Sequence, residues 1–224
     1  MVTVLYENDN IIVCLKPCGV SSQESKSTNM PSLLREYLKN DNAYIGVVHR
    51  LDTLVGGVMV YAKTKQAAAE LSLQIQNGIF IKEYIAAVSG KPEGDNGVYE
   101  DLLFKDSHKN KSFVVKRERK GIKKASLKYS LIDTAVYKDT ETSLVKVKLI
   151  TGRTHQIRVQ FSSRKMPLLG DKKYGSRFDC PLSLWSYRVS FSDPESGENL
   201  TFATLPENIE PWNKFDIAKL KAES

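Results

Sequence analysis

Short runs of apolar residues alternate with turn-forming residues along most of this 224-residue chain. Where such runs are rich in β-branched and aromatic residues and are bounded by Gly, Pro, Asn or Asp, they predict strands. The expected strands are residues 2–6, 11–16, 44–48, 58–62, 79–88, 112–115, 125–132, 144–150, 184–191 and 200–203.

Three segments have apolar residues at helical spacing. Residues 65–76 have the most regular spacing, and Asn77-Gly78 supplies a stop signal. Residues 31–38 begin with a proline, which the first turn of a helix tolerates. Residues 154–163 begin with Thr154, the expected N-cap.

These elements predict one α+β domain over residues 1–224, with a mixed, mostly antiparallel sheet and flanking helices. We expect a loop at residues 90–97 and find no internal repeat, low-complexity segment or linker. The hydrophobic share of 41% and the charged share of 26% are those of a soluble globular protein. No apolar stretch approaches the length of a bilayer and the start does not resemble a signal peptide, so we expect a cytoplasmic protein with no membrane segment.

Positive charge is concentrated in one part of the chain. The whole sequence has 33 Lys and Arg against 26 Asp and Glu, a net charge of +7. Residues 105–124 contain nine basic and two acidic residues, so this segment carries the entire surplus. Such concentration predicts a polyanion partner, most simply nucleic acid, although a solvated hairpin that serves solubility explains it equally well. The residues expected to bind RNA here are Lys116, Arg117, Arg119 and Lys120.

The three cysteines, Cys14, Cys18 and Cys180, do not form a disulfide framework. Their odd number and the reducing compartment expected for this protein indicate free thiols. Cys14 and Cys18 could begin a metal site, but no second Cys or His pair with ligand spacing follows. We therefore expect no metal.

Two charged motifs carry the candidate chemistry. Val47-Val48-His49-Arg50-Leu51-Asp52 ends a strand-like run and opens a glycine-containing loop, and Gly152-Arg153-Thr154-His155-Gln156-Ile157-Arg158 follows about a hundred residues later. A lone Asp at the end of a strand is usually a turn residue. An Asp close to one Arg, with a second Arg-bearing motif to meet it, instead indicates a paired catalytic carboxylate.

His49-Arg50-Leu51-Asp52, followed by Gly57, resembles the signature of the RluA-type pseudouridine synthases. Further segments match that family in order and in approximate spacing: the opening at residues 4–19, Lys82-Glu83-Tyr84, residues 152–158 and residues 170–175. The resemblance extends from about residue 4 to about residue 206. It implies an isomerase that converts specific uridines of structured ribosomal or transfer RNA to pseudouridine, without a cofactor, at a central RNA-binding cleft.

The resemblance also assigns catalytic roles. Asp52 is implied as the catalytic carboxylate, which acts at the ribose as nucleophile or as base. Arg153 is implied as the cation that keeps this carboxylate ionised, and its planar fork suits the task. Tyr84 is implied as the ring that stacks on the target uracil.

Other residues are expected to bind the substrate. Arg50 resembles the family residue that fills the gap or steadies the nucleotide once the uridine is flipped out. Ile157 is implied as an apolar wall, and Lys82 belongs to the second motif of the family. His49 and His155 have no partner motif for triad or metal chemistry, so we expect supporting hydrogen bonds from them.

Each assignment has a plainer alternative. Arg50 and Asp52 could simply pair across a turn, and Tyr84 could be an ordinary strand aromatic of the core. Arg153 could be a phosphate contact at the surface, and Ile157 a core residue of its helix. Taken together in the order of the family, the motifs favour the catalytic interpretation.

The chain departs from the family pattern in two places. The family usually continues after its signature with x-x-Thr-Ser-Gly, where this chain has Thr53-Leu54-Val55-Gly56-Gly57, and Leu184-Trp185-Ser186 stands where Leu-His-Ala is common. The first departure supports an alternative, an RNA-binding protein or RNA chaperone that has lost the chemistry. A metal-dependent nuclease is disfavoured because no clustered carboxylates accompany Asp52.

Many relatives also carry a small N-terminal RNA-binding domain. This chain begins directly with the segment that resembles the catalytic domain, so we expect the surface of that domain to recognise RNA. We expect it to act as a monomer.

Overall fold

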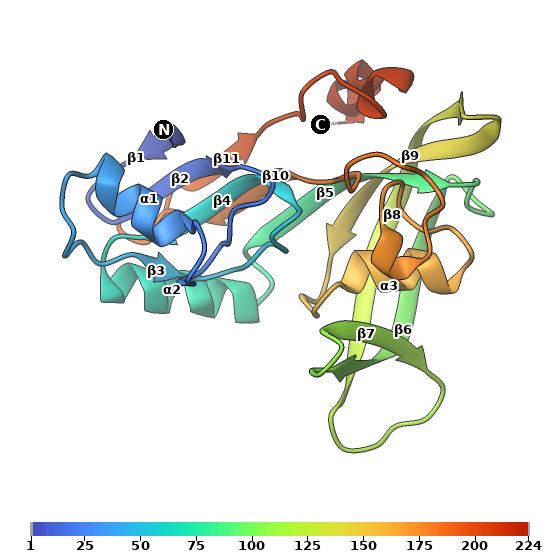
Figure 1. The fold of residues 1–224 in the computed structure, drawn as a ribbon. Helices are drawn as coiled ribbons and strands as arrows, with labels where there is room; N and C mark the ends of the chain where they lie inside the picture. The colour runs from blue at the N-terminus through green and yellow to red at the C-terminus, as the bar shows by residue number, and fades with distance from the viewer. Residues whose placement is uncertain (1, 224) are drawn as a thin grey trace. The chain divides into compact units, whose positions relative to one another are not determined.

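The computed structural model describes residues 2–223. The chain folds into two compact units, each assembled from two segments. Unit 1 comprises Met1–Glu83 and Trp185–Pro206, and unit 2 comprises Tyr84–Leu184 and Glu207–Ser224. Figure 1 follows the chain from blue to red through its elements.

Unit 1 is built on a group of neighbouring strands in the order β1-β2-β4-β10. These strands are β1 (Thr3–Glu7), β2 (Ile11–Lys16), β4 (Gly56–Ala62) and β10 (Leu184–Ser192), with β3 (Gly46–Val47) on β4 and β11 (Asn199–Ala203) on β10. The pairs β1–β2, β2–β4, β3–β4 and β10–β11 are antiparallel, whereas β10 pairs with β4 in parallel. The parallel contact joins Trp185 to Gly56 and Ser186 to Gly57.

Two helices accompany these strands, and a side chain caps each. Helix α1 (Met30–Tyr37) starts at Asn29, whose side chain accepts a hydrogen bond from the amide of Ser32. Helix α2 (Lys65–Gln76) starts at Thr64 in the same way. The core of unit 1 joins α2 to β2, β4 and β10 through buried side chains: Ile11, Val13, Val58, Val60, Ala62, Ala67, Leu71, Phe80, Val189 and Phe191.

Unit 2 contains strands in the order β5-β9-β8-β6-β7, of which the pairs β9–β8, β8–β6 and β6–β7 are antiparallel. They are β5 (Ile81–Ser89), β6 (Asn96–Asp106), β7 (Lys111–Val115), β8 (Ile122–Tyr137) and β9 (Thr140–Leu149). In Figure 1, β6, β7 and the first part of β8 extend away from the rest of this unit toward the loop at residues 116–121. Helix α3 (Gln156–Ser163) packs on these strands, with Val159 in a cluster with Leu103, Ala125 and Tyr174.

Three 3-10 helices complete the described residues: η1 (Lys172–Tyr174), η2 (Trp212–Lys214) and η3 (Ile217–Glu223). The last two belong to the terminal segment, which packs on β8. There Asp133 accepts hydrogen bonds from Lys219 Nζ at 2.6 Å and from the amide of Asp216 at 2.8 Å. The sequence did not predict these helices.

The expected class, mixed and mostly antiparallel strands with helices, is confirmed, and β2 and α2 have the predicted bounds. Three local predictions were wrong. Strand β6 was missed, and it begins at Asn96 inside the predicted loop, because its residues show no regular alternation and include several charges. Strand β3 spans two residues instead of five. The single catalytic domain over residues 1–224 stays a prediction.

The third error concerns the start of α3. Its N-cap is His155 and not Thr154, and no side chain caps this end. His155 has a left-handed backbone with φ of 53°, which is uncommon for a residue other than glycine. The backbone therefore turns sharply between Arg153 and the helix.

Candidate active site

Asp52 lies in the loop between β3 and β4 of unit 1 and is half-buried. Its two apolar neighbours in the loop fix it from both sides, since Leu51 is 7% exposed and Val55 is 2% exposed. The carbonyl of Asp52 accepts a hydrogen bond from the amide of Val55 at 2.9 Å, which closes a turn. The loop thus presents a partly solvated carboxylate from a backbone that is anchored in the core.

A buried lysine supports the same loop. Lys16 ends β2 and is fully buried, and its ammonium group donates to the carbonyls of Pro17 at 2.8 Å, Val20 at 2.7 Å and Thr53 at 3.1 Å. Three N–H donors of the ammonium group are thus matched by three carbonyl acceptors. The residue next to Asp52 is therefore tied to the loop that follows β2.

Burial lowers the pKa of Lys16 to about 8, and the negative charges of Cys18 and Asp52 oppose this effect. The charges of Lys16 and Asp52 are thus close enough to attract each other. This role of Lys16 was not among the expectations from the sequence. The sequence does contain a sign of this burial. Lys16 ends an otherwise apolar strand directly before Pro17-Cys18-Gly19, so the strand has no polar face on which a lysine would be solvated.

His49 is buried in unit 1, where it supports β4. Its Nε2 accepts a hydrogen bond from the amide of Val60 at 3.0 Å, and its ring lies 5.3 Å from that of Phe80. An accepting Nε2 requires the neutral ring with the proton on Nδ1. Burial, with a smaller effect of the charge of Lys82, lowers the pKa of His49 to about 3. The supporting hydrogen bond expected of His49 is present.

The two departures from the family pattern face each other in unit 1. A Cβ atom on Gly56 would lie 2.5 Å from the ring of Trp185, and one on Gly57 would lie 2.3 Å from the carbonyl oxygen of Ser186. Gly57 also has φ of 122°, which side chains rarely adopt. The indole of Trp185 occupies the space that a serine at position 56 would need. The larger side chain at position 185 and the smaller residue at position 56 therefore compensate for each other across the β4–β10 pair.

The motif Lys82-Glu83-Tyr84 lies on β5, where alternate side chains point to opposite faces. Glu83 is buried and accepts a hydrogen bond from Nε of Arg188 within an ion pair. Lys82 is half-buried, and burial lowers its pKa. Tyr84 is 5% exposed, so its ring is largely covered. Arg50, by contrast, is exposed and donates to Oε1 of Gln23 at 3.1 Å.

In unit 2, Arg153 is exposed on the loop that precedes α3. Its Nε donates to the carbonyl of Lys124 at 2.9 Å, and its amide donates to Oε1 of Gln156 at 2.9 Å. Ile157 is buried in the first turn of the helix. His155 forms the expected supporting hydrogen bond, which joins its Nδ1 and the hydroxyl of Tyr174 at 2.9 Å.

A buried ion pair fixes the other side of α3. Arg158 donates from Nε and NH2 to the two carboxylate oxygens of Asp171 at 2.7 and 2.8 Å, and both residues are buried. The bidentate geometry is the one that compensates best for desolvation. Asp171 precedes η1, whose Tyr174 accepts a hydrogen bond from the amide of Ser112 on β7. The Arg158–Asp171 ion pair thus joins the two motifs at residues 152–158 and 170–175.

The basic residues expected to bind RNA lie in the loop between β7 and β8. Lys116, Arg117, Arg119 and Lys120 are all exposed. The guanidinium of Arg119 lies 5.5 Å from the centre of the Phe104 ring. Next to the loop is an open pocket of about 430 Å³, lined by Leu102, Glu118, Arg119, Ile122 and Lys124. The loop therefore presents exposed cations beside this pocket.

The structure thus divides the predicted site residues between its two units. His49, Arg50, Asp52 and Lys82 belong to unit 1, whereas Tyr84, Arg153, Ile157 and the four basic loop residues belong to unit 2. Within residues 2–223, no group of three or more His, Cys, Asp or Glu side chains is arranged to hold a metal ion. All three cysteines are free. No helix in the described part of the chain is long and apolar enough to span a membrane.

Comparison with known proteins gives the class. Residues 10–163 match the family model described as RNA pseudouridylate synthase. The chain is 33% identical to the dual-specificity RNA pseudouridine synthase RluA of Escherichia coli strain K12, over 89% of this chain and 90% of that protein. It is 31% identical to the ribosomal large subunit pseudouridine synthase D of Neisseria meningitidis, over 98% of this chain but only 62% of that protein.

Two solved structures share the fold. The human RNA pseudouridylate synthase domain containing 1 has a TM-score of 0.78 at 18% identity, over 100% of this chain and 94% of that one. The human RNA pseudouridylate synthase domain containing 4 has a TM-score of 0.77 at 22% identity, over 98% and 93%. The chain belongs to the RNA pseudouridylate synthase family and, within it, to the RluA type. It is therefore an isomerase that acts on RNA.

Proposed function

We propose that this chain converts specific uridines of structured ribosomal or transfer RNA to pseudouridine, with Asp52 as the reacting carboxylate. One observation carries the proposal: Asp52 is a half-buried carboxylate on a loop anchored by two buried apolar neighbours and by the ammonium group of Lys16. Such a group combines access to a substrate with a fixed position and a nearby positive charge, as acid–base and nucleophilic catalysis require.

The reaction breaks the N1–C1′ bond of uridine and forms a C5–C1′ bond, after which the proton on C5 is released. Asp52 acts at the ribose, either as the nucleophile that attacks C1′ or as the base that removes a ribose proton. The proposal needs no cofactor, because one bond of uracil is exchanged for another without redox change. Arg153 supplies the guanidinium fork that favours an ionised carboxylate, and Tyr84 and Ile157 supply apolar surface for the base.

Recognition of RNA is assigned to exposed cations. Arg50 is exposed beside the Asp52 loop and is proposed to steady the nucleotide once the target uridine is flipped out. The four basic side chains of residues 116–121 are proposed to contact RNA phosphates. Lys82 is half-buried and is proposed to contact the substrate. The buried position of His49 favours support of β4 over contact with RNA.

Three further points belong to the proposal. The two units are proposed to work as one catalytic domain over residues 1–224, acting as a monomer in the cytoplasm. The name of the E. coli relative includes dual specificity, and that of the Neisseria relative names the large ribosomal subunit. The second name supports ribosomal RNA, one of the two substrate classes proposed for this chain, and neither name specifies transfer RNA.

The alternative is an RNA-binding protein or chaperone that has lost the chemistry. Its only support was the loss of two hydroxyl residues after Asp52. The packing of Trp185 against Gly56 gives a steric reason for the glycine, which weakens this support. The alternative is not favoured.

The test uses RNA labelled with tritium at C5 of uridine, prepared from cells without this gene. Turnover is measured by release of label, because product and substrate have the same mass and cannot be distinguished by it. We expect release by the wild-type chain and none above background by Asp52→Asn, and maps of pseudouridine in cells with and without the gene then locate the target. RNA binding without release of label by the wild-type chain would favour the chaperone.

A further inference from the structure

Two phenylalanines are cross-strand partners where β6 and β7 extend away from the rest of unit 2 (Figure 1). The strand register pairs Phe104 with Phe113, Leu102 with Val115, and Phe104 also with Ile122 of β8. Paired residues have their side chains on the same face of a sheet, and successive residues alternate between the faces. One face of the extension, here called the outer face, therefore gathers five apolar side chains: Leu102, Phe104, Phe113, Val115 and Ile122.

The opposite face of these strands packs on helix α3. Leu103 and Val114, which alternate with residues of the outer face, form a cluster with Val159 of the helix. The outer face therefore lies on the side away from α3. Each of its residues is half-buried or exposed, and Phe113 is 37% exposed. Contiguous apolar surface that is bordered by polar residues marks an interaction site.

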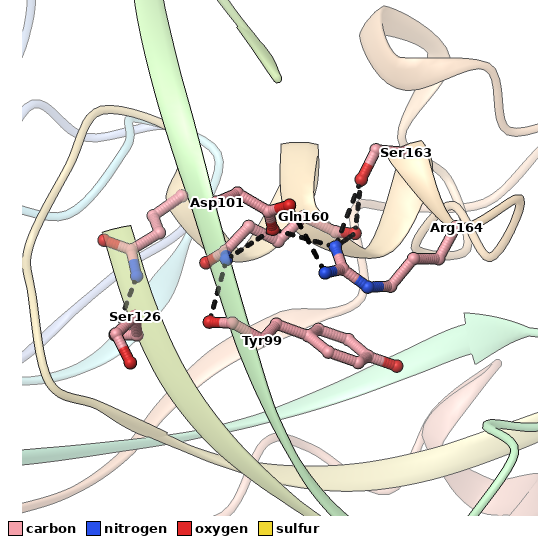
Figure 2. A network of polar contacts seen from close by, with 7 residues as sticks. Tyr99, Asp101, Ser126, Gln160, Ser163 and Arg164 are labelled. Atoms are coloured by element: carbon pink, nitrogen blue, oxygen red, sulfur yellow. Dashed lines mark hydrogen bonds and ion pairs between the residues drawn. The ribbon is translucent and has the colours of Figure 1, made fainter. Parts of the chain in front are cut away.

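Strand β6 enters this extension from an anchored segment. Figure 2 shows how Gln160 of α3 holds it, because its Nε2 donates to the carbonyl of Tyr99 at 3.1 Å and to Oδ2 of Asp101 at 2.8 Å. NH1 of Arg164 also donates to Oδ2 of Asp101 at 2.8 Å. Asp101 directly precedes Leu102, so the outer face begins on a strand that is already fixed, and binding a ligand there requires less ordering.

A cation lies beside each phenyl ring of the outer face. The guanidinium of Arg119 lies 5.5 Å from the centre of the Phe104 ring, and Nζ of Lys111 lies 5.6 Å from the centre of the Phe113 ring. Strand β7, which carries Phe113, is at the end of the strand order, so a ligand can reach this ring from the edge of the sheet.

The pocket next to the basic loop opens on the same face. Leu102 and Ile122 line it together with Glu118, Arg119 and Lys124. The carboxylate of Glu118 lies 3.7 Å from Nζ of Lys124, so the acidic charge in the pocket is paired. The volume of about 430 Å³ falls within the roughly 300–1,000 Å³ typical of sites for small ligands. Apolar surface beside positive charge suits a planar ring that is attached to an anion.

We propose that the outer face binds an unpaired nucleotide of the RNA substrate, with its base stacked on Phe113 and its phosphates at the cations of the basic loop. Every base has a π-face, and aromatic side chains are the usual partners of bases that are splayed out of single-stranded regions. A duplex does not present its base faces along its length. Charge favours RNA over a protein partner, since residues 105–124 contain nine basic and two acidic residues.

This inference rests on the proposed function and deepens it, because it adds contact with a base to the phosphate contacts assigned to the basic loop. The experiment measures the affinity of the wild-type chain and of Phe113→Leu by fluorescence anisotropy. Two labelled RNA probes with the same number of phosphates are used: single-stranded oligoadenylate, which contains no uridine, and a blunt duplex.

Leucine keeps an apolar side chain at position 113 and removes the ring. We expect Phe113→Leu to bind oligoadenylate about 5- to 30-fold more weakly and the duplex within about twofold of the wild-type chain. The slope of log affinity against log salt should stay the same, because no charge is removed. Unchanged affinity for oligoadenylate, or an equal loss for the duplex, would overturn the inference.

Two further variants separate the ring from a general effect of substitution. Phe113→Trp keeps a π-face, so its affinity for oligoadenylate should be at least half that of the wild-type chain, and its additional indole emission should be quenched by the bound base. Tyr44→Leu removes a ring that is 41% exposed in unit 1, and should leave both affinities unchanged. Equal losses in Tyr44→Leu and Phe113→Leu would overturn the inference.

Failure of this inference can be distinguished from failure of the proposed function. Release of C5 label by the wild-type chain, with no effect of Phe113→Leu on oligoadenylate binding, would refute the inference alone. If the wild-type chain releases no label, the proposed function is refuted, whereas weaker binding of oligoadenylate by Phe113→Leu would still support the outer face as a nucleotide site.

Discussion

The Asp52 loop and the basic loop at residues 116–121 are both assigned to the substrate, yet they are built in opposite ways. Leu51, Val55 and the fully buried Lys16 anchor the first, whereas the four cations of the second are exposed. A reacting carboxylate needs a fixed position, which burial of its neighbours supplies. Phosphate contacts need reach and solvated charge, which a surface loop supplies. Substitutions should therefore affect chemistry and folding in the first loop, and affinity and salt dependence in the second.

The largest expected effect is on turnover. Asp52→Asn keeps the size of the side chain and removes its charge, so the rate of label release should fall about 1000-fold or more. Affinity for RNA should change by less than about threefold, and a thermal melt checks for any loss of stability. Near-normal turnover would refute the catalytic assignment, and a large loss of RNA affinity would erase the contrast with the basic loop.

The packing of the Asp52 loop gives the next effect. Gly56→Ser places a Cβ within 2.5 Å of the Trp185 ring, so the free energy of unfolding should fall by about 1–3 kcal/mol in urea titrations. Combining it with Trp185→His, which restores the residues common in the family at both positions, should cost less than the two single changes together. Additive losses would show that the two positions are independent.

The buried His49 makes stability depend on pH. Its pKa is lowered from 6.5 to about 3 in the folded chain, so the unfolded chain binds more protons between these values. This contribution is fully present above pH 6.5 and is lost as pH falls toward 3, with a slope of up to about 1.4 kcal/mol per pH unit. His49→Gln keeps an acceptor for the amide of Val60 but does not titrate. Urea titrations from pH 7 to 4 should give a shallower slope for this variant, and an unchanged slope would contradict the assignment.

The basic loop should give the smallest effect on the fold. Replacing Lys116, Arg117, Arg119 and Lys120 by Gln should weaken RNA binding and lower the slope of log affinity against log salt by about 0.7–0.9 per lost phosphate contact. The free energy of unfolding should change by less than about 0.5 kcal/mol. The same loss of charge at the exposed Lys26, Lys39, Lys65 and Lys91 is the control. An equal change of slope in both variants would mean that net charge, and not this loop, attracts RNA.

Several features of this protein can be predicted from local sequence. Helix α2 has a regular apolar face, a Thr cap and a glycine stop, and β2 is a continuous apolar run, so both were predicted with their observed bounds. The class of protein followed from motifs in a fixed order. The basic segment was visible as well, because net charge adds along the chain whatever the fold.

Other features depend on partners that are distant in sequence. Strand β6 was missed because its half-exposed residues lack strong alternation, and pairing with β7 and β8 creates it. The exchange of volume between Gly56 and Trp185 and the bonds of Lys16 to Thr53 join segments far apart in the chain.

The burial of Gln156 also depends on a partner in another segment of the chain. A glutamine in a helix gives no local sign of burial, and only the approach of β8 supplies Ser126 as a partner for its amide. Local sequence thus predicted the class, the most regular elements and the candidate residues. Which polar side chains are buried was decided by the tertiary structure alone, because a buried polar group is stable only where another segment completes its hydrogen bonds.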